Sequence, residues 1–182
     1  MTDKKTILVI NGSASVSSSN ERLIERLKGV MEAKGRGAFE IMVWPSLKTL
    51  PHFDPELAVG EVPAEVVALR RAIEEADGVL ICTPEYIFSI PSGLKNVLEW
   101  CVATTVFTDK PVGMITASAS GEKGHEELQL ILRTVMAKLS EETTLLIPGI
   151  KGKIDTRGEF TDEKTQRAFE RFVVSFMGFM EG

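Results

Sequence analysis

A cluster of hydroxyl side chains is the first sign of chemistry in this sequence. Residues 11–20 contain five serines and lie between an apolar run at residues 7–10 and an amphipathic segment. A helix start presents unpaired N–H groups and partial positive charge, to which serine hydroxyls add further donors. Such a loop binds a phosphate monoester without Lys or Arg. The alternative is a serine-rich turn that only caps a helix.

Other phosphate-binding and serine motifs do not fit these residues. A GxxxxGK[ST] loop requires a lysine, and a GxGxxG fingerprint requires more than the single glycine Gly12. The GxSxG motif of serine hydrolases is absent, which leaves that class a remote alternative. The position of residues 11–20 after the first apolar run favours a ligand-binding role over a capping role, because ligands of open α/β sheets bind beyond the carboxyl ends of the strands.

A second candidate loop follows the apolar run at residues 79–83. It carries Pro84, Tyr86, Phe88 and Pro91. Proline fixes its own φ and restricts the residue before it, so the loop can hold backbone N–H and C=O groups toward a planar ring. Taken alone, the two aromatic residues are interpreted as packing residues. Beside a phosphate-binding loop they favour a flavin, to which Tyr86 offers apolar area.

The elements that position these loops alternate along the chain. Runs that are apolar throughout are typical of parallel strands buried on both faces, and amphipathic segments separate them. Asn20 lies where the N-cap of the first helix is expected. The pattern predicts a three-layer α/β domain formed by residues 1–182, with helices on both faces of a five-stranded sheet. The expected strands are residues 7–10, 39–43, 79–83, 112–116 and 144–147, and the expected helices are residues 21–33, 64–75, 94–103, 126–139 and 163–180. Residues 44–62 are expected to be an irregular connection that either forms a rim of the site or has no role in it.

Both loops resemble those of the NADPH-dependent FMN reductases, a family that includes quinone, chromate and azo-compound reductases. The most specific motif is Pro84-Glu85-Tyr86 followed by Pro91-x-Gly93-Leu94-Lys95-Asn96 and Trp100. The resemblance covers nearly the whole chain and implies a flavodoxin-like fold with strand order 2-1-3-4-5. It further implies that hydride passes from NADPH or NADH to bound FMN, and that electrons then pass to a flavin, quinone or similar small acceptor.

The resemblance also implies which residues bind the cofactor. Residues 11–20 resemble the family's phosphate loop, although Ser15 stands where the family has arginine, and Ile87 stands where it has asparagine. Loss of a bidentate arginine predicts weaker FMN binding or a relaxed preference for NADPH. Residues 117–125 resemble a third, glycine-containing loop. The predicted cofactor-binding residues are Gly12, Ser13, Ser15, Ser18, Ser19, Asn20, Pro84, Glu85, Tyr86, Ile87, Ser118 and Gly121.

No catalytic side chain and no metal site are predicted, because the flavin carries the chemistry. His125 is expected to be a solvated residue at a helix start, not a general acid or a nucleotide contact, and His52 is treated alike. Cys82 and Cys101 fit no metal-binding spacing and are expected to be buried thiols in a reducing compartment.

Charge and composition narrow the range of partners. The 182-residue chain carries a formal charge of -5 without a basic block, which disfavours nucleic acid and membrane surfaces. Its first apolar run is too short for a signal peptide or membrane span, so a cytoplasmic location is expected. Residues 94–103 look apolar on more than one side, which indicates burial against another subunit as well as the sheet. Because such a helix helps to build a dimer in the family that the chain resembles, the resemblance implies a homodimer or homotetramer.

Two alternative functions remain open at this point. One is a flavodoxin-type electron carrier, which exchanges electrons with a protein partner and does not oxidise NAD(P)H. The other is a regulatory subunit that has lost FMN, which the departures at Ser15 and Ile87 keep in consideration.

Overall fold

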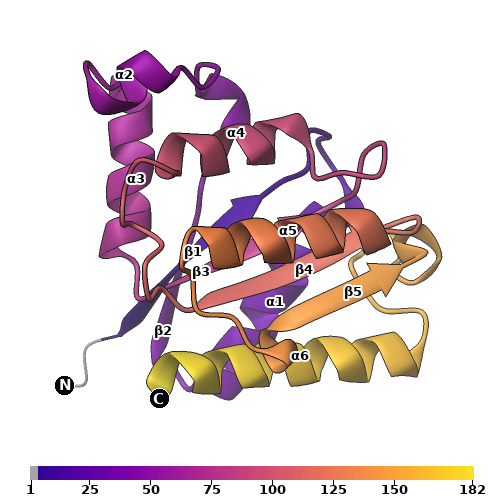
Figure 1. The fold of residues 1–182 in the computed structure, drawn as a ribbon. Helices are drawn as coiled ribbons and strands as arrows, with labels where there is room; N and C mark the ends of the chain where they lie inside the picture. Colours follow the sequence, from indigo (N-terminus) through magenta and orange to yellow (C-terminus); the bar gives the residue numbers. More distant parts are fainter. Residues whose placement is uncertain (1–3) are drawn as a thin grey trace.

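A parallel sheet forms the middle layer of the fold (Figure 1). The fold is described from a computed structural model, which covers residues 4–182; residues 1–3 of the predicted domain lie outside the described part. The strand order β2-β1-β3-β4-β5 confirms the prediction. The strands are β1 (Lys5–Asn11), β2 (Phe39–Val43), β3 (Gly78–Thr83), β4 (Val112–Ser118) and β5 (Thr144–Pro148).

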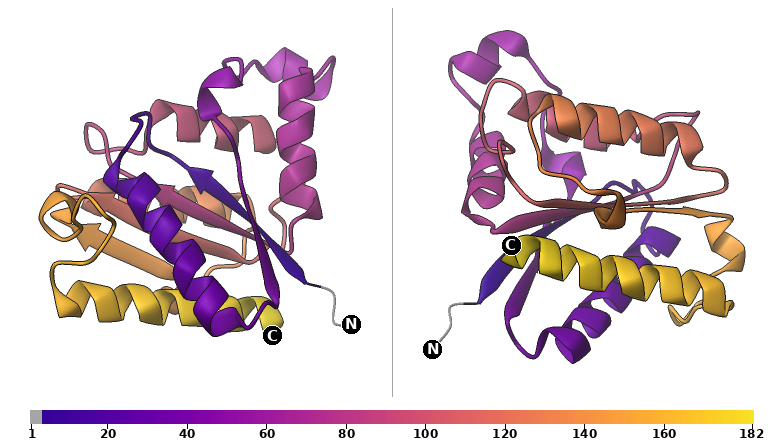
Figure 2. Two further views of the ribbon diagram at one scale, coloured as in Figure 1. Left: turned by 180° about the vertical axis from the view of Figure 1, so that it is seen from behind. Right: turned by 60° about the horizontal axis from the view of Figure 1, so that its bottom comes forward.

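Helices cover both faces of the sheet, as Figure 2 shows for α5 and α6 on opposite sides. One face packs against α1 (Ser19–Gly35) and α6 (Glu163–Glu181), and the other against α3 (Ala64–Glu75), α4 (Ser92–Cys101) and α5 (Glu122–Thr134). Shorter elements are the 3-10 turns η1 (Leu47–Thr49), η2 (Glu141–Thr143) and η3 (Ile150–Gly152) and the helix α2 (Pro55–Val59).

Side chains point alternately to the two faces of the sheet along each strand, so the sheet contributes to two hydrophobic cores. Val9 pairs with Leu80, and both pack toward α1 and α6, whereas Leu8 and Val79 pack toward the opposite helices. This is the two-residue period of a strand, and it leaves apolar side chains on both faces. The strand β2 departs from the expected burial, because it is an edge strand, and Met42 is 41% exposed.

Residues 44–62 are more ordered than expected and pack on α4. They contain η1 and α2, and Asn96 of α4 accepts a hydrogen bond from Phe53 N (2.7 Å) and donates one to Pro51 O (2.9 Å). Trp100 donates its indole N–H to the same Pro51 oxygen (2.8 Å). Both apolar sides of α4 are therefore covered within the chain. The apolar sides of this helix therefore no longer indicate contact with another subunit, and the homodimer or homotetramer stays a prediction.

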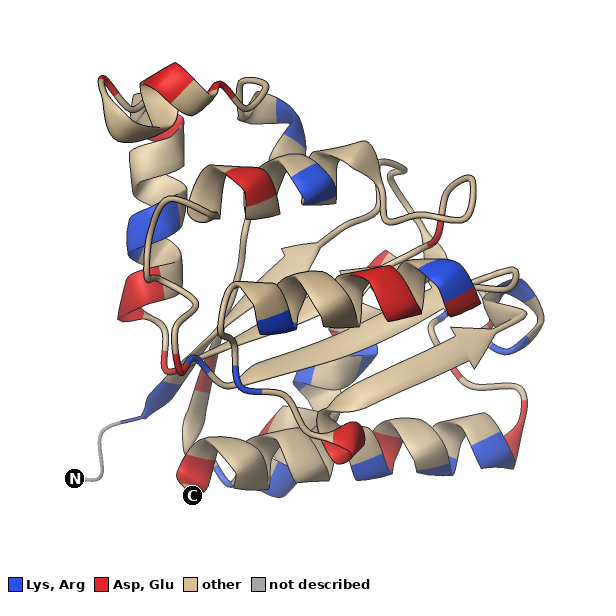
Figure 3. Cartoon of the chain, viewed as in Figure 1, with Lys and Arg blue, Asp and Glu red and all other residues tan. Residues whose placement is uncertain are grey.

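Charged side chains are spread over the helices and loops, whereas β3, β4 and β5 carry none (Figure 3). Within residues 4–182, no helix is long and apolar enough to span a membrane. The same residues contain no cluster of three or more His, Cys, Asp or Glu side chains that could hold a metal ion.

Candidate functional site

Three loops meet at the carboxyl ends of neighbouring strands. The serine-rich loop (residues 11–20) follows β1, the tyrosine loop (residues 84–91) follows β3, and the third loop (residues 117–125) follows β4. They border a cleft of about 1190 Å³. The cleft contains eight of the twelve predicted residues, namely Ser13, Ser15, Ser18, Ser19, Asn20, Pro84, Tyr86 and Ser118. The other four do not line it: Gly12 lines a neighbouring pocket, and Glu85, Ile87 and Gly121 line neither.

The serine-rich loop is shaped by its own short hydrogen bonds. Asn11 Oδ1 accepts from Ser13 N (3.0 Å), and Ser13 Oγ accepts from Ser15 N (3.3 Å). Ser17 adopts a left-handed φ of 54°. Ser18, not Asn20, is the N-cap of α1, because its hydroxyl accepts from Glu21 N (3.1 Å). The loop thus brings the positive end of α1 to the cleft.

Asn20 has a structural role that its position in the sequence did not reveal. Its side chain is buried, donates to Ala117 O (3.1 Å) and accepts from the Cys82 thiol (3.3 Å). One amide therefore connects the first turn of α1 to the ends of β3 and β4. The expectation of an N-cap failed because this site offers a buried polar side chain two tertiary partners.

Gly12 allows the serine-rich loop to approach β3. A Cβ atom at this position would lie 2.4 Å from Thr83 Oγ1, and Gly12 N donates to Cys82 O (2.8 Å). No larger residue fits without displacing the end of β3. Gly12 is thus placed where it sets the spacing of two loops.

The Glu85 carboxylate points toward the start of α5. It accepts from Gly121 N (3.2 Å) and from Gly124 N (2.8 Å), while Ser118 Oγ donates to the Glu85 carbonyl (3.2 Å). Gly121 is the N-cap residue, and its φ of 90° is suited to glycine. Glu85 therefore supplies, from another loop, the capping acceptor that α5 lacks in its own sequence.

A second carboxylate holds the tyrosine loop from the opposite direction. Glu127 of α5 accepts from Ser89 Oγ (2.7 Å) and from Ile90 N (2.9 Å). Sequence reasoning missed this residue, because Glu127 looks like an ordinary charged residue of an amphipathic helix. Together, Glu85 and Glu127 join the tyrosine loop to α5 at both of its sides.

The tip of the tyrosine loop is a tight turn with an unusual sequence. Tyr86 and Ser89 exchange two backbone hydrogen bonds, and both residues between them have positive φ, 50° at Ile87 and 60° at Phe88. A β-branched residue is strained there. Ile87 and Phe88 are 95% and 75% exposed. The backbone of this turn, not the Ile87 side chain, shapes the edge of the site.

Tyr86 connects the tyrosine loop to the serine-rich loop. Hydrogen bonding to Ser13, and to a lesser degree to Ser15 and the backbone of Ala14, holds the pKa of its phenol below the usual value, although partial burial opposes this. Its ring lines the cleft and also a smaller pocket of about 520 Å³, which is lined in addition by Trp44, Lys48 and His52. Of the connection at residues 44–62, the part up to His52 therefore forms a rim of this smaller pocket.

His125 is not a solvated residue, contrary to expectation. Its Nδ1 lies 2.9 Å from Thr116 Oγ1 of β4 and its Nε2 lies 3.1 Å from Gln129 Nε2 of α5, so both ring nitrogens have partners. Burial lowers the pKa of His125, which favours the neutral ring. His52 is exposed, as expected.

Both thiols are free and buried, as expected. Burial raises the pKa of Cys101 to about 12 and raises that of Cys82 further. Neither group is a thiolate near neutral pH, which makes both unreactive.

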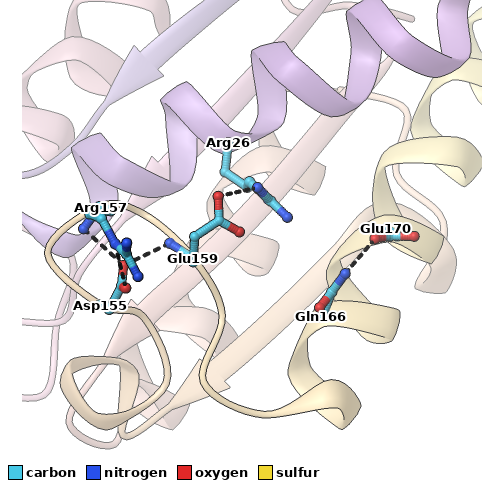
Figure 4. Close-up of polar contacts among 6 residues, drawn as sticks. All are labelled: Arg26, Asp155, Arg157, Glu159, Gln166 and Glu170. Atoms are coloured by element: carbon cyan, nitrogen blue, oxygen red, sulfur yellow. Dashed lines mark hydrogen bonds and ion pairs between the residues drawn. The ribbon is translucent and has the colours of Figure 1, made fainter.

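The outer side of the cleft is formed by a segment that the sequence did not single out, the outer loop (residues 149–156) between β5 and α6. Figure 4 shows how this region is held: Arg26 of α1 pairs with Glu159 at 2.8 Å. Asp155 accepts from Arg157 N (2.8 Å) and Glu159 N (2.9 Å), which folds the segment back on itself. Lys151 of the outer loop and Arg22 of α1 add two cations to the cleft wall.

This donor set fits a phosphorylated planar cofactor. Hydroxyls, a helix N-terminus and two cationic side chains line the cleft, while Asp155, the acidic residue of the lining, accepts hydrogen bonds from the backbone that follows it. Pro84 and the aromatic ring of Tyr86 add apolar area to the same cleft. The strand order and this cleft define the class as flavodoxin-like flavoproteins, in which the cofactor lies at this edge of the sheet.

Comparison with known proteins narrows the class. The sequence profile of the NADPH-dependent FMN reductases matches residues 6–148, and the chain belongs to this family. It resembles the quinone reductase of Escherichia coli (strain K12), with 31% identity over 173 residues, 91% of this chain and 89% of the relative. An NADPH:quinone oxidoreductase of Arabidopsis thaliana is 32% identical over 139 residues, which cover 73% of this chain and 71% of that protein.

A solved structure agrees with this assignment. FerB, a flavoenzyme NAD(P)H:acceptor oxidoreductase from Paracoccus denitrificans, superposes with a TM-score of 0.76 at 27% identity and covers 97% of each chain. These matches confirm the predicted class, an FMN-dependent oxidoreductase that uses NAD(P)H.

Proposed function

We propose that this protein reduces a small quinone to the hydroquinone at the cleft between the three loops. The overall reaction consumes one NAD(P)H and one proton for each quinone and releases NAD(P)+. Bound FMN supplies the redox chemistry, because it accepts hydride from a nicotinamide and passes two electrons on. The observation that carries the proposal is the cleft itself, where the serine hydroxyls at a helix start and the ring of Tyr86 line one cavity. The names of the relatives support a quinone as the acceptor.

The predicted residues form two groups, those that contact the cofactor and those that position the loops. Ser13, Ser15, Ser18, Ser19 and the start of α1 bind the phosphate, and the backbone of Pro84, Tyr86 and Ser118 borders the ring. Gly12, Asn20, Glu85 and Gly121 act as positioning residues, because their contacts join the loops to one another. Ile87 acts only through its backbone, whose positive φ forms the turn of the tyrosine loop. No protein side chain is assigned a catalytic role.

An anaerobic absorbance spectrum tests the proposal. Protein loaded with FMN and washed is expected to lose its visible flavin absorbance when NADH or NADPH is added, and to regain it when a benzoquinone follows. Bound FMN that neither nucleotide bleaches would contradict the proposal and favour an electron carrier. A protein that retains no FMN would favour a regulatory subunit.

We also infer one domain over residues 1–182, a homodimer or homotetramer, and a cytoplasmic location. Exposed apolar side chains on two of the loops support the oligomer: Val16, which lines the cleft, is 87% exposed, and Ile87 and Phe88 at the tip of the tyrosine loop are 95% and 75% exposed. Sedimentation equilibrium tests the oligomeric state, and a monomer at micromolar concentration would contradict the proposal.

The cytoplasmic location is supported by the thiols, because free, buried thiols suit a reducing compartment. Cell fractionation tests the location.

A further inference from the structure

The smaller pocket of about 520 Å³ contains residues that the proposed binding of FMN does not use. Ligand pockets enclose about 300 to 1,000 Å³ and combine apolar walls with a few polar groups. The aromatic residues of this lining are Trp44 and Tyr86, and its basic residues are Lys48 and His52. The pocket therefore offers aromatic surface and positive charge to one ligand.

A tight turn after β2 holds Trp44 and Lys48. The carbonyl of Ser46 accepts the indole N–H of Trp44 (3.2 Å), and the hydroxyl of Ser46 accepts from Lys48 N (3.2 Å). Thr49 Oγ1 donates to the same carbonyl (3.2 Å). Because the indole N–H is satisfied within the turn, the Trp44 ring offers its apolar area to the pocket and not a hydrogen bond.

Lys48 brings a positive charge to the pocket. It is exposed, and none of the ion pairs formed within residues 4–182 includes it. His52 adds a ring N–H donor to the same lining. Glu21 of α1 also lines the pocket, and its charge disfavours an anion next to it. An anionic group of a ligand is therefore expected at Lys48.

The reactants of the proposed function match this lining to different degrees. A quinone is neutral and needs no cation, whereas a nicotinamide dinucleotide carries a second aromatic ring, adenine, together with phosphates. Its nicotinamide must reach the flavin, which leaves the adenosine phosphate to bind elsewhere. The smaller pocket adjoins the larger cleft, because four residues line both cavities, namely Ser13, Ser15, Val16 and Tyr86. The adenosine phosphate is thus the part of a reactant that suits the smaller pocket.

We propose that the smaller pocket binds the adenosine phosphate portion of NADH or NADPH, with adenine against the indole of Trp44 and a phosphate paired with Lys48. The inference rests on the proposed function, because it assigns the pocket to the hydride donor. Trp44 and Lys48 bind the donor and take no part in hydride transfer. Their replacement is therefore expected to change the affinity for the donor and not the rate of the chemical step.

Isothermal titration calorimetry with adenosine and with 5′-AMP tests the base and the phosphate separately. The protein is loaded with FMN, which keeps 5′-AMP out of the larger cleft. The wild type is expected to bind 5′-AMP roughly fivefold more tightly than adenosine, because the phosphate adds an ion pair. Lys48→Gln is expected to abolish this difference and to leave the affinity for adenosine unchanged. Lys164→Gln is the matched control and is expected to change neither, because Lys164 is an exposed lysine of α6 that lines neither cavity.

Tryptophan fluorescence tests the stacking of adenine. Trp100 is fully buried, so quenching by 5′-AMP in the flavin-free wild type reports on Trp44. Trp44→Leu is expected to lose the quenching and to bind both adenosine and 5′-AMP roughly fivefold or more weakly, because the stacking surface is removed. If Trp44→Leu does not fold, quenching in the wild type still tests the stacking, and Lys48→Gln still tests the phosphate contact.

Steady-state kinetics provide a readout that separates this inference from the proposed function. Lys48→Gln is expected to raise the KM for the nicotinamide donor and to leave kcat and the KM for a benzoquinone unchanged. A KM that rises for the quinone alone would overturn the inference and assign the pocket to the acceptor. The inference also fails if 5′-AMP gives neither heat nor quenching, and the proposed function then stands if NADH or NADPH still bleaches the flavin. Bound FMN that neither nucleotide bleaches overturns the proposed function, and with it the assignment of the pocket to a hydride donor.

Discussion

Replacing Glu85 with alanine is expected to uncouple two loops of the site. Its carboxylate accepts the N–H groups of Gly121 and Gly124, both of which are buried at the start of α5. Alanine leaves both donors without an acceptor, and water reaches this part of α5 poorly. The helix loses its capping acceptor and the tyrosine loop loses one of its two connections to α5.

The expected cost follows from these two bonds. A hydrogen bond to a charged group contributes about 1.5 to 3 kcal/mol, and because Glu85 is half-buried the lower figure applies to each. The loss is therefore about 3 kcal/mol in the free energy of unfolding. For a chain of this length, that corresponds to a decrease of roughly 6 to 12 °C in Tm.

Urea unfolding followed by circular dichroism measures this loss, with Glu122→Ala as the matched control. Glu122 is an exposed residue in the first turn of α5, so its removal takes away the same charge near the same helix end. That control is expected to cost about 0.5 kcal/mol, through the helix dipole alone. If Glu85→Ala is no more destabilising than Glu122→Ala, the capping role assigned to Glu85 is wrong.

Three further predictions concern strain, titration and thiol burial. Ile87→Asn should raise the free energy of unfolding by about 1 kcal/mol, because asparagine tolerates positive φ better than isoleucine; urea unfolding that shows no gain would refute the strain. The folded-state pKa of His125 lies below its unfolded value, so some stability present above about pH 6.5 is lost as the pH falls. His125→Asn should reduce that loss in urea unfolding at pH values of about 7 and about 5, and an identical pH dependence would count against burial as the cause. Cys82 and Cys101 should react with Ellman's reagent in denaturant but not in the native protein, and rapid labelling of the native protein would contradict their burial.

The elements of the fold could be predicted from local pattern. The predicted bounds of β2 and α3 match the structure residue for residue, and the other strands differ by a few residues at their ends. Strands buried on both faces are apolar throughout, and this signal is present in the sequence before any tertiary contact is known. The bounds of α5 were harder: the sequence predicts a helix at residues 126–139, but α5 spans Glu122–Thr134. Its start was missed because its capping acceptor Glu85 lies elsewhere in the chain.

The sequence by itself determined the strand order through its family resemblance, and it identified the loops that meet at the sheet edge. Only the tertiary structure decided what each side chain does there. The register that pairs Asn11 with Cys82 and Thr83 with Thr116 brings three strand ends together, and it lets Asn20 bond across two of them. The outer loop (residues 149–156) reaches the same cleft because β5, which precedes it, pairs in parallel with β4 and ends at the same edge of the sheet. Such contacts join residues far apart in sequence, and no local pattern encodes them, because they depend on how parallel strands align in space.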